Sequence, residues 1–345
     1  MKIQKTIKIG EENADLVFFE NIKIEYYLRN LPYKIRMENV YEVKQVTGEK
    51  WVVFNDYFNE KLSLQILDLM VKYQKVQFGT SFNQPISCNT DISQDGKYIS
   101  IIPNGVTHIK FIDILDDDLY FPNEEEKSMF NQPVNNLPNS LIYLEFGYHF
   151  NQPVDNLPDS LTHLEFGNKF NKPVDNLPEG LQYLQFGYSF NNPVDNLPKS
   201  LKILKLSTIY NLPLINLPQH LEELELGEHF NHPIRKEDLP KNLKKIKFGF
   251  AFNHPIEGDS PTGKFSIFPD SLEEVKLGMN FDYPINILPN SLQVLNLHRN
   301  YRKKVSYFPS SLKEIKIGVE YEYIEEIPKE VKIHLLRRQR GFWFY

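Results

Sequence analysis

A repeat of about 20 residues constrains the fold of this chain more than any other feature of its sequence. The unit reads FNxPVxNLPxSLxxLxFGxx and is complete in residues 150–169. Self-similarity at such a short period is typical of a solenoid, in which each unit stacks on the next. The aromatic first residue of the unit recurs at Phe82, Phe130, Phe150, Phe170, Phe190, Tyr210, Phe230, Phe252, Phe281, Tyr301 and Tyr321.

Each part of the unit predicts a separate structural role. The segment Leu161–Phe166 predicts a short strand in which Leu164 and Phe166 point to one side and the residues between them to the other. The two prolines of the unit lack a backbone donor, so they mark corners and an extended return path. Gly167 is expected to end the strand because glycine tolerates the φ values of a sharp bend. Stacked units would join their strands into a parallel sheet over a continuous core.

Asparagine follows the aromatic residue in eight copies of the unit. A buried corner amide can bond to the backbone of neighbouring coils, so we predict an asparagine ladder. The alternative is a surface turn asparagine, chosen for its tolerance of unusual φ. Asp282 and Arg302 replace the amide in late copies, where the ladder is expected to lapse. The eight positions are Asn83, Asn131, Asn151, Asn171, Asn191, Asn211, Asn231 and Asn253.

These residues resemble the FNIP repeat family, a relative of leucine-rich repeats found in social amoebae and giant viruses. The resemblance covers about residues 82–333 and rests on aromatic-Asn-x-Pro, followed at fixed spacing by Leu-Pro-x-x-Leu-x-x-Leu. It implies a solenoid that acts as a binding surface. In some viral members an F-box-like start links the protein to host ubiquitin ligases. Residues 31–35, Leu-Pro-Tyr-Lys-Ile, imitate that start, but similar fragments occur in the repeats themselves.

The predicted fold class is mainly β, a leucine-rich-repeat-like solenoid of about 20-residue coils with a parallel sheet and an N-terminal cap of mixed α/β. About ten or eleven coils are expected. Residues 1–75 are expected to cap the first coil, with strands at 40–46 and 51–54 and a helix at 59–71. Residues 76–335 would form the solenoid, and 336–345 a basic-aromatic tail that packs on the last coil or serves as a docking peptide. Insertions are expected near 87–101, 112–129 and 257–266.

Composition narrows the functional classes. The formal net charge of −6 disfavours general nucleic-acid binding, because few basic groups are left to neutralise phosphates. The single cysteine, Cys88, cannot form an internal disulfide. The N-terminus lacks the apolar core of a signal peptide, and no apolar run is long enough for a membrane helix. We therefore expect a cytoplasmic protein that does not bind membranes.

The sequence lacks the common catalytic motifs. It contains no GxSxG, P-loop, dinucleotide fingerprint, HExxH or CxxC motif, so we predict a protein that is not an enzyme and needs no cofactor. His229, His232 and His254 could hold zinc, but their slot varies between copies and favours a surface position. The acidic residues between 113 and 126 lack the spacing of a calcium loop, which favours a solvated loop without metal.

Aligning the outward strand positions of successive coils predicts a binding face. A column of aromatic residues begins at His108, beside a second column that begins at Lys110, whereas the late coils carry mixed charges. Tyrosine gives a large contact area with a polar tip, as at interface centres. The alternative is that these residues only satisfy strand propensity on an exposed sheet. The predicted binding residues are Tyr143, His163, Tyr183, Tyr148, Tyr188, Glu145 and Glu165.

The predicted function is a non-enzymatic scaffold that presents its sheet face to a protein partner. The resemblance adds a finer prediction, the recognition part of a ubiquitin-ligase adaptor. Two alternatives stay open: a structural or self-associating particle component, and a metal or enzymatic site in the N-terminal segment. The sequence predicts neither the identity of the partner nor the oligomeric state.

Overall fold

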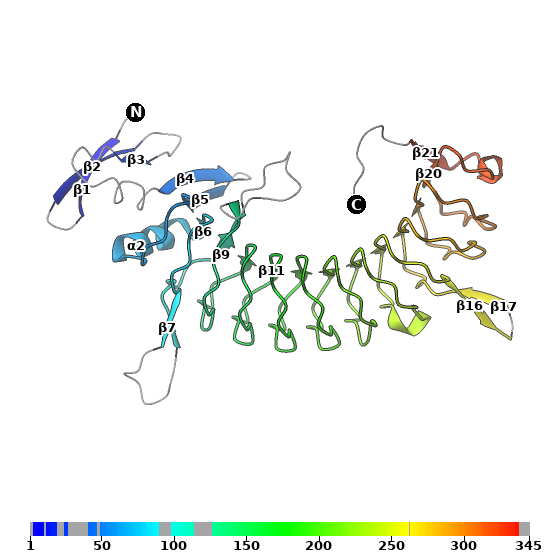
Figure 1. Cartoon of the computed structure of the whole chain (residues 1–345), viewed down its shortest axis with the longest axis horizontal. Coiled ribbons are helices and arrows are strands. Elements are labelled where there is room, and N and C mark those ends of the chain that lie inside the picture. Colours follow the sequence, from blue (N-terminus) through cyan, green and yellow to red (C-terminus); the bar gives the residue numbers. More distant parts are fainter. Residues whose placement is uncertain are drawn as a thin grey trace. The chain divides into compact units, whose positions relative to one another are not determined.

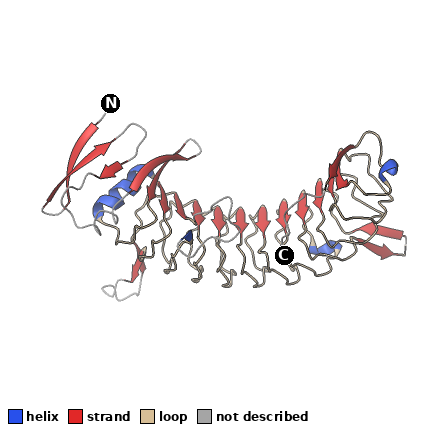
Figure 2. Cartoon of the chain, turned by 45° about the horizontal axis from the view of Figure 1, so that its top comes forward, coloured by secondary structure: helices blue, strands red, loops and turns tan. Residues whose placement is uncertain are grey.

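The computed structural model describes residues 3–9, 12–18, 24–26, 41–46, 49–89, 98–113, 126–261 and 263–337. The chain divides into two compact units. Figure 1 shows the stacked coils and labels several of the strands and the helix α2, Leu64–Tyr73. The first unit consists of Met1–Lys172 and Asn176–Leu181, and the second of Pro173–Asp175 and Gln182–Tyr345. In both units each coil contributes one short strand, and loops make up most of the remaining chain (Figure 2).

The main sheet of the first unit contains six described strands in the order β4-β5-β6-β9-β10-β11. Neighbouring strands are parallel except for β4 and β5, which form an antiparallel hairpin at the end of the row. This hairpin gives the parallel array an antiparallel edge strand. The bounds are Tyr41–Val46, Glu49–Phe54, Lys75–Phe78, His108–Phe111, Tyr143–Glu145 and His163–Glu165.

Smaller elements complete the first unit. Strands β1 (Ile3–Ile9), β2 (Glu12–Phe18) and β3 (Ile24–Tyr26) form an antiparallel sheet. The first insertion forms the hairpin of β7 (Ser87–Asn89) and β8 (Tyr98–Ser100).

The predicted N-terminal strands and helix are confirmed, with a shift in the helix bounds. The helix α2 spans Leu64–Tyr73 rather than 59–71. It begins after Ser63, whose side chain accepts a hydrogen bond from the backbone N of Ile66 at 3.5 Å, as an N-cap does. It ends at Gln74, which is left-handed at φ 61°.

The second unit contains eight parallel strands in the order β12-β13-β14-β15-β18-β19-β20-β21. Its insertion at 257–266 forms the hairpin of β16 (Glu257–Ser260) and β17 (Gly263–Ser266), and two 3-10 turns lie at Lys236–Asp238 and Ile324–Glu326. The eight strands are Tyr183–Gln185, Ile203–Lys205, Glu223–Glu225, Lys245–Lys247, Glu274–Lys276, Val294–Asn296, Glu314–Gly318 and Lys332–Leu336.

The parallel strands correspond to about 13 coils, more than the ten or eleven predicted. The two additional coils contain β5 and β6, which precede the first recognisable repeat. Phe58 stacks on Phe82 with ring centroids 5.7 Å apart, and Asn59 accepts a hydrogen bond from the backbone N of Asn83 at 2.9 Å. Phe58 and Asn59 therefore form the same corner as the Phe-Asn pairs of the later coils, although no Leu-Pro segment follows them.

The core is built from residues at equal positions in successive coils. Leu144 pairs with Leu164 in the strand register, and both are 0% exposed. The corner phenylalanines stack at a regular interval, with 6.1 Å between the ring centroids of Phe130 and Phe150 and again between Phe150 and Phe170. One side of each strand therefore faces a continuous apolar column, as predicted.

The strand-ending glycine has a different role from the one predicted. Among the described glycines only Gly105 and Gly263 have positive φ, so Gly167 does not use the conformational freedom of glycine. A Cβ atom on Gly167 would instead overlap the backbone carbonyl of Gly147 in the preceding coil. Glycine is needed here because the backbones of adjacent coils approach too closely for a side chain.

The asparagine ladder is present in both units, at the surface rather than in the core. In the second unit the Oδ1 atom of Asn211 accepts a hydrogen bond from the backbone N of Asn231 at 3.0 Å, and Asn231 does the same for Asn253. These asparagines are exposed, so the ladder satisfies corner N–H groups at the coil surface. It continues one coil further than predicted, since the N of Asp282 donates to Asn253 at 3.1 Å.

We expect Asn211→Ala to lower the free energy of unfolding by about 0.5–1.5 kcal/mol, because it removes one net hydrogen bond at an exposed corner. Urea denaturation would measure the change. Asn211→Asp keeps a side-chain acceptor and serves as the matched control, with a smaller loss expected. Equal losses in the two variants would contradict a role for Oδ1 as acceptor.

Candidate functional site

The outward face of the first unit carries a row of aromatic side chains on successive strands. The strand register aligns His108 with Tyr143 and Tyr143 with His163. On β5, Trp51 precedes Val52, which pairs with Val76, so Trp51 extends the same row, although it is buried at 4% exposure. Trp51, His108, Tyr143 and His163 are called the aromatic row below. Between Trp51 and His108 the row position is held by Lys75.

The rings of the aromatic row pack on one another. The ring centroids of His108 and Tyr143 lie 5.6 Å apart, and those of Tyr143 and His163 lie 4.4 Å apart, both at 16° between planes. Trp51 meets His108 edge-on, at 5.7 Å and 78°. Because a histidine ring covers each face of Tyr143, the row offers ring edges and polar tips. It is therefore unsuited to stacking a base or sugar on Tyr143.

Two carboxylates fix the polar tips of the row. The hydroxyl oxygen of Tyr143 lies 2.7 Å from Oε2 of Glu145 and 3.0 Å from Oε1 of Glu165. Nε2 of His163 lies 2.8 Å from Oε1 of Glu165, and Nζ of Lys110 lies 2.8 Å from Oε2 of Glu145. The structure thus brings together four predicted residues, Tyr143, His163, Glu145 and Glu165, in one network.

The surroundings of the row set its charge. Burial, reinforced by the positive charge of Lys75, lowers the pKa of His108 to about 4, so this imidazole is neutral at pH 7. Burial opposes ionisation of Glu165, but hydrogen bonds from His163 and Tyr143 outweigh it and lower the pKa of that carboxyl group. Burial, with the two nearby carboxylates, strongly raises the pKa of Tyr143. At neutral pH the row therefore presents a neutral phenol and imidazole beside an ionised carboxylate.

Lysines border the row at its Trp51 end. Nζ of Lys110 lies 4.9 Å from the ring centroid of Tyr143 and 5.6 Å from that of Trp51, within the range of cation–π attraction. Lys75 lies 5.8 Å from the Trp51 ring and pairs with Glu49. Trp51 and Lys75 were not predicted as site residues. Each stands seven residues before a corner phenylalanine, as Tyr143 does, and that spacing could have identified them.

The remaining predicted residues lie elsewhere. Tyr148 sits in the turn after β10, where the ammonium groups of Lys127 and Lys169 lie 4.4 and 5.6 Å from its ring centroid. Tyr183 and Tyr188 belong to the second unit. There the Tyr183 hydroxyl donates to Gln185 at 2.6 Å, and Tyr188 is 50% exposed.

The histidines considered for zinc take part in contacts between coils. Nε2 of His232 lies 3.0 Å from the carbonyl oxygen of Asn211, and Nε2 of His254 lies 3.0 Å from that of Asn231. Gln152 makes the same contact with Asn131 at 3.1 Å. Among the described residues no three His, Cys, Asp or Glu side chains form a group that could hold a metal. Most of the acidic insertion, residues 114–125, lies outside them.

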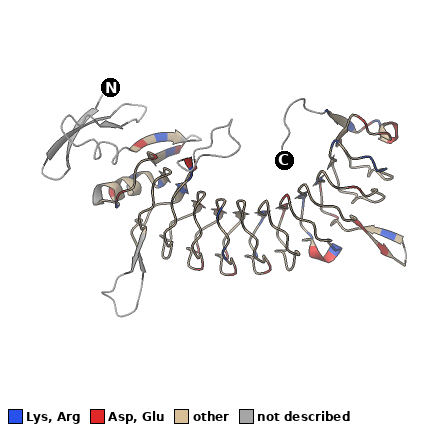
Figure 3. Cartoon of the chain, viewed as in Figure 1, with Lys and Arg blue, Asp and Glu red and all other residues tan. Residues whose placement is uncertain are grey.

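The outward face of the second unit carries charges of both signs (Figure 3). Nζ of Lys245 lies 2.7 Å from Oε1 of Glu223, and Lys247 pairs with Glu225 in the same two coils. Exposed pairs of this kind contribute little to stability. The mixed charges predicted for the late coils are therefore matched between these two coils, whereas Lys247 and Lys276 are like-charged register partners in the next two.

Coils that each add one parallel strand, with apolar columns inside and polar corner ladders, define a leucine-rich-repeat-like solenoid protein. The FNIP Repeat model matches residues 130–169, 193–229, 230–278, 262–300 and 284–320. The chain therefore contains FNIP repeats within residues 130–320. No curated protein matches it.

One solved structure supports the leucine-rich-repeat-like solenoid fold. CroV588, a circular leucine-rich-repeat protein from a giant virus, matches with a TM-score of 0.61 and 28% identity. The match covers 81% of this chain and 42% of CroV588, so the chain spans less than half the length of that relative. YopM from Yersinia enterocolitica WA-314 gives a TM-score of 0.29 and 17% identity, over 76% of this chain and 64% of YopM. Within the described residues no helix could cross a membrane.

Proposed function

We propose that the chain is a cytoplasmic protein-interaction scaffold whose binding surface is the aromatic row with its flanking Lys110, Glu145 and Glu165. The observation that carries this proposal is the Tyr143 network. It holds a half-buried aromatic side chain between two histidines, with its hydroxyl fixed by two carboxylates on the outward face of the sheet.

Preorganisation supports a binding role for this face. Ordering a mobile side chain opposes association by about 0.5–1.5 kcal/mol, and a side chain that is already ordered avoids much of that loss. Tyr143, His163 and Glu165 are held by one another before any partner arrives. Carboxylates and lysines on the rim would favour a partner of complementary charge and fix its orientation.

The proposal predicts that Tyr143→Ala weakens binding of the partner by at least about 2 kcal/mol, as loss of an interface-centre tyrosine does. The partner would first be identified by pull-down of the wild-type chain and mass spectrometry. Its affinity for purified variants would then be measured by isothermal titration calorimetry. Tyr183→Ala tests separately whether the same strand position in the second unit contributes.

Tyr57→Ala is the matched control, because Tyr57 is 64% exposed and lies outside the aromatic row in the first unit. It should leave the affinity unchanged, and melting temperatures would identify any variant that is poorly folded. A Tyr143→Ala protein that is folded and retains wild-type affinity would move the binding site away from the aromatic row.

The ligase-adaptor role is a finer form of this proposal and rests on the family resemblance. Residues 31–35, the F-box-like fragment, lie outside the described residues. The same pull-down tests this role: recovery of ligase subunits would support an adaptor, whereas recovery of the chain alone would favour a self-associating structural component.

A further inference from the structure

The aromatic row has more hydrogen-bond acceptors than donors at its polar tips. The hydroxyl group of Tyr143 carries a single proton. Oxygen atoms of two carboxylates, Oε2 of Glu145 and Oε1 of Glu165, nevertheless lie 2.7 and 3.0 Å from it. Only one of them can receive the proton at a time, so the network can accept a further donor.

The second oxygen of each carboxylate is open. Lys110 contacts Oε2 of Glu145, and His163 contacts Oε1 of Glu165, so both approach the oxygen atoms that already face Tyr143. In the described part of the chain, Oε1 of Glu145 and Oε2 of Glu165 accept no hydrogen bond, and neither belongs to the buried atoms that lack a partner. The two residues are register partners on adjacent strands, about 4.8 Å apart, so one ligand group can reach both.

His108 adds a third acceptor on the other side of Tyr143. The hydroxyl group of Thr107 donates to the carbonyl oxygen of Gln74 at 3.2 Å, so its oxygen accepts from Nδ1 of His108 at 2.8 Å. Because the imidazole is neutral at pH 7 and its proton is on Nδ1, Nε2 keeps its lone pair. Nε2 is therefore an acceptor, like the two open carboxylate oxygens.

The charges of the row leave one carboxylate in excess. Lys75 pairs with Glu49 and Lys110 with Glu145, whereas the contacts of Glu165 are to a histidine and a tyrosine. A metal ion is a poor complement, because the described residues contain no group of three His, Cys, Asp or Glu side chains that could hold one. The open acceptors and the excess charge together favour an organic cation that carries N–H donors.

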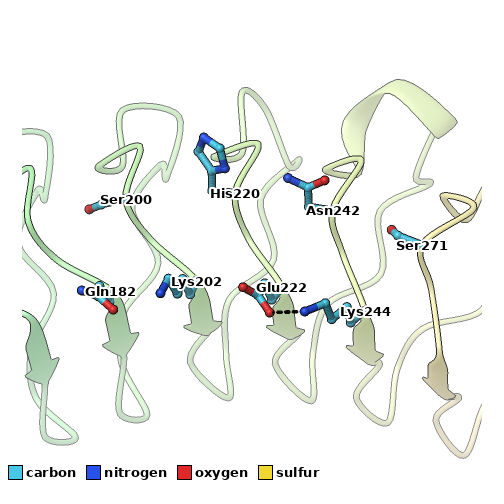
Figure 4. A pocket seen from close by; sticks show the side chains of 8 residues that line it. All are labelled: Gln182, Ser200, Lys202, His220, Glu222, Asn242, Lys244 and Ser271. Atoms are coloured by element: carbon cyan, nitrogen blue, oxygen red, sulfur yellow. Dashed lines mark hydrogen bonds and ion pairs between the residues drawn. The ribbon is translucent and has the colours of Figure 1, made fainter.

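Two carboxylates of the second unit provide a contrast. In the groove of about 520 Å³ that Figure 4 shows, Nζ of Lys244 lies 2.6 Å from Oε2 of Glu222. On the outward strand face, Lys247 pairs with Glu225, which holds the same strand position as Glu165. These carboxylates are neutralised by lysines. Glu225 is therefore a matched control for Glu165.

The guanidinium group of arginine meets the requirements of the row. It has five N–H donors in a planar fork and no acceptor, so it can bridge carboxylates on adjacent strands. A lysine ammonium is a point charge whose three donors leave from one atom. We propose that the aromatic row binds an arginine side chain of its protein partner between the open oxygens of Glu145 and Glu165, with Nε2 of His108 accepting an N–H group of the same segment. This inference rests on the function proposed above and names the chemistry of the partner.

Two fluorescein-labelled peptides of equal charge, one with four Arg-Gly pairs and one with four Lys-Gly pairs, test the proposal by fluorescence anisotropy with the full chain. We expect the arginine peptide to bind at least about tenfold more tightly than the lysine peptide, a difference of about 1.4 kcal/mol. No binding of the arginine peptide, or equal affinity for the two peptides, would overturn the proposal.

Glu165→Gln keeps the shape of the side chain and removes its charge. It should bind the arginine peptide at least about fivefold more weakly, because hydrogen bonds to an ionised acceptor are stronger than neutral ones. Glu225→Gln removes the same charge from a lysine pair and should change binding by less than about twofold. Melting temperatures would show that both variants are folded. Equal losses in the two variants would overturn the proposal, because net charge alone would then explain the binding.

The measurements separate this inference from the proposed function. If Tyr143→Ala weakens binding of the partner recovered by pull-down while the arginine peptide shows no preference over the lysine peptide, the arginine inference fails and the aromatic row stands as the interaction surface. If Tyr143→Ala leaves the affinity of that partner unchanged, the proposed function fails, and this inference fails with it.

Discussion

Phe150→Ala is expected to lower the free energy of unfolding by about 3–5 kcal/mol, in the range for loss of a buried aromatic ring. The side chain is 0% exposed and stacks on Phe130 and Phe170 in the adjacent coils. It also lies 3.6 Å, centroid to centroid, from Phe146 of the same coil. Removing it leaves a cavity that touches three rings. Because each coil is stabilised by its neighbours, damage to one coil weakens both of its interfaces.

Urea denaturation monitored by circular dichroism would measure this loss. Phe150→Leu retains more of the buried volume and should lose clearly less stability. If Phe150→Ala loses no more than Phe150→Leu, the phenylalanine stack does not carry the stability assigned to it.

Leu164→Ala is expected to lower the free energy of unfolding by about 2–5 kcal/mol. Leu164 is 0% exposed and lies beside Leu144 in the apolar column of the sheet. Asp159→Ala is the matched control from the same coil, since Asp159 is an exposed corner residue and its loss should have little effect. Equal losses at the two positions would mean that the assignment of inward and outward residues is inverted.

The sequence predicts most of the array because its spacing is nearly invariant. Leu144, Leu164 and Phe150 recur at fixed intervals, so their burial follows once the period is recognised. The coils of β5 and β6 were missed because Phe58 and Asn59 appear without the prolines that mark the later corners. The role of Gly167 was misassigned because the need for a missing Cβ arises from the carbonyl of another coil.

Part of the candidate site was predicted, again because its residues recur at fixed intervals. Tyr143, His163, Glu145 and Glu165 stand in recognisable repeats, so their alignment could be read from the sequence. Trp51 was missed because Phe58, the corner residue seven positions after it, lacks the prolines of the later copies. The open carboxylate oxygens of the row were not predicted, because they depend on which oxygens the side chains of neighbouring strands contact.

The asparagine ladder has a consequence for how such chains can change length. Each hydrogen bond of the ladder joins the asparagine Oδ1 of one coil to the backbone N–H of the next. A coil within the ladder therefore donates one hydrogen bond to the preceding coil and accepts one from the following coil. Duplicating or removing one whole unit within the ladder would restore the same bonds at the new junction, whereas a change of a few residues would break them. Unequal recombination between repeats in the gene can therefore alter the size of the scaffold in steps of one coil while the corner hydrogen bonds are conserved.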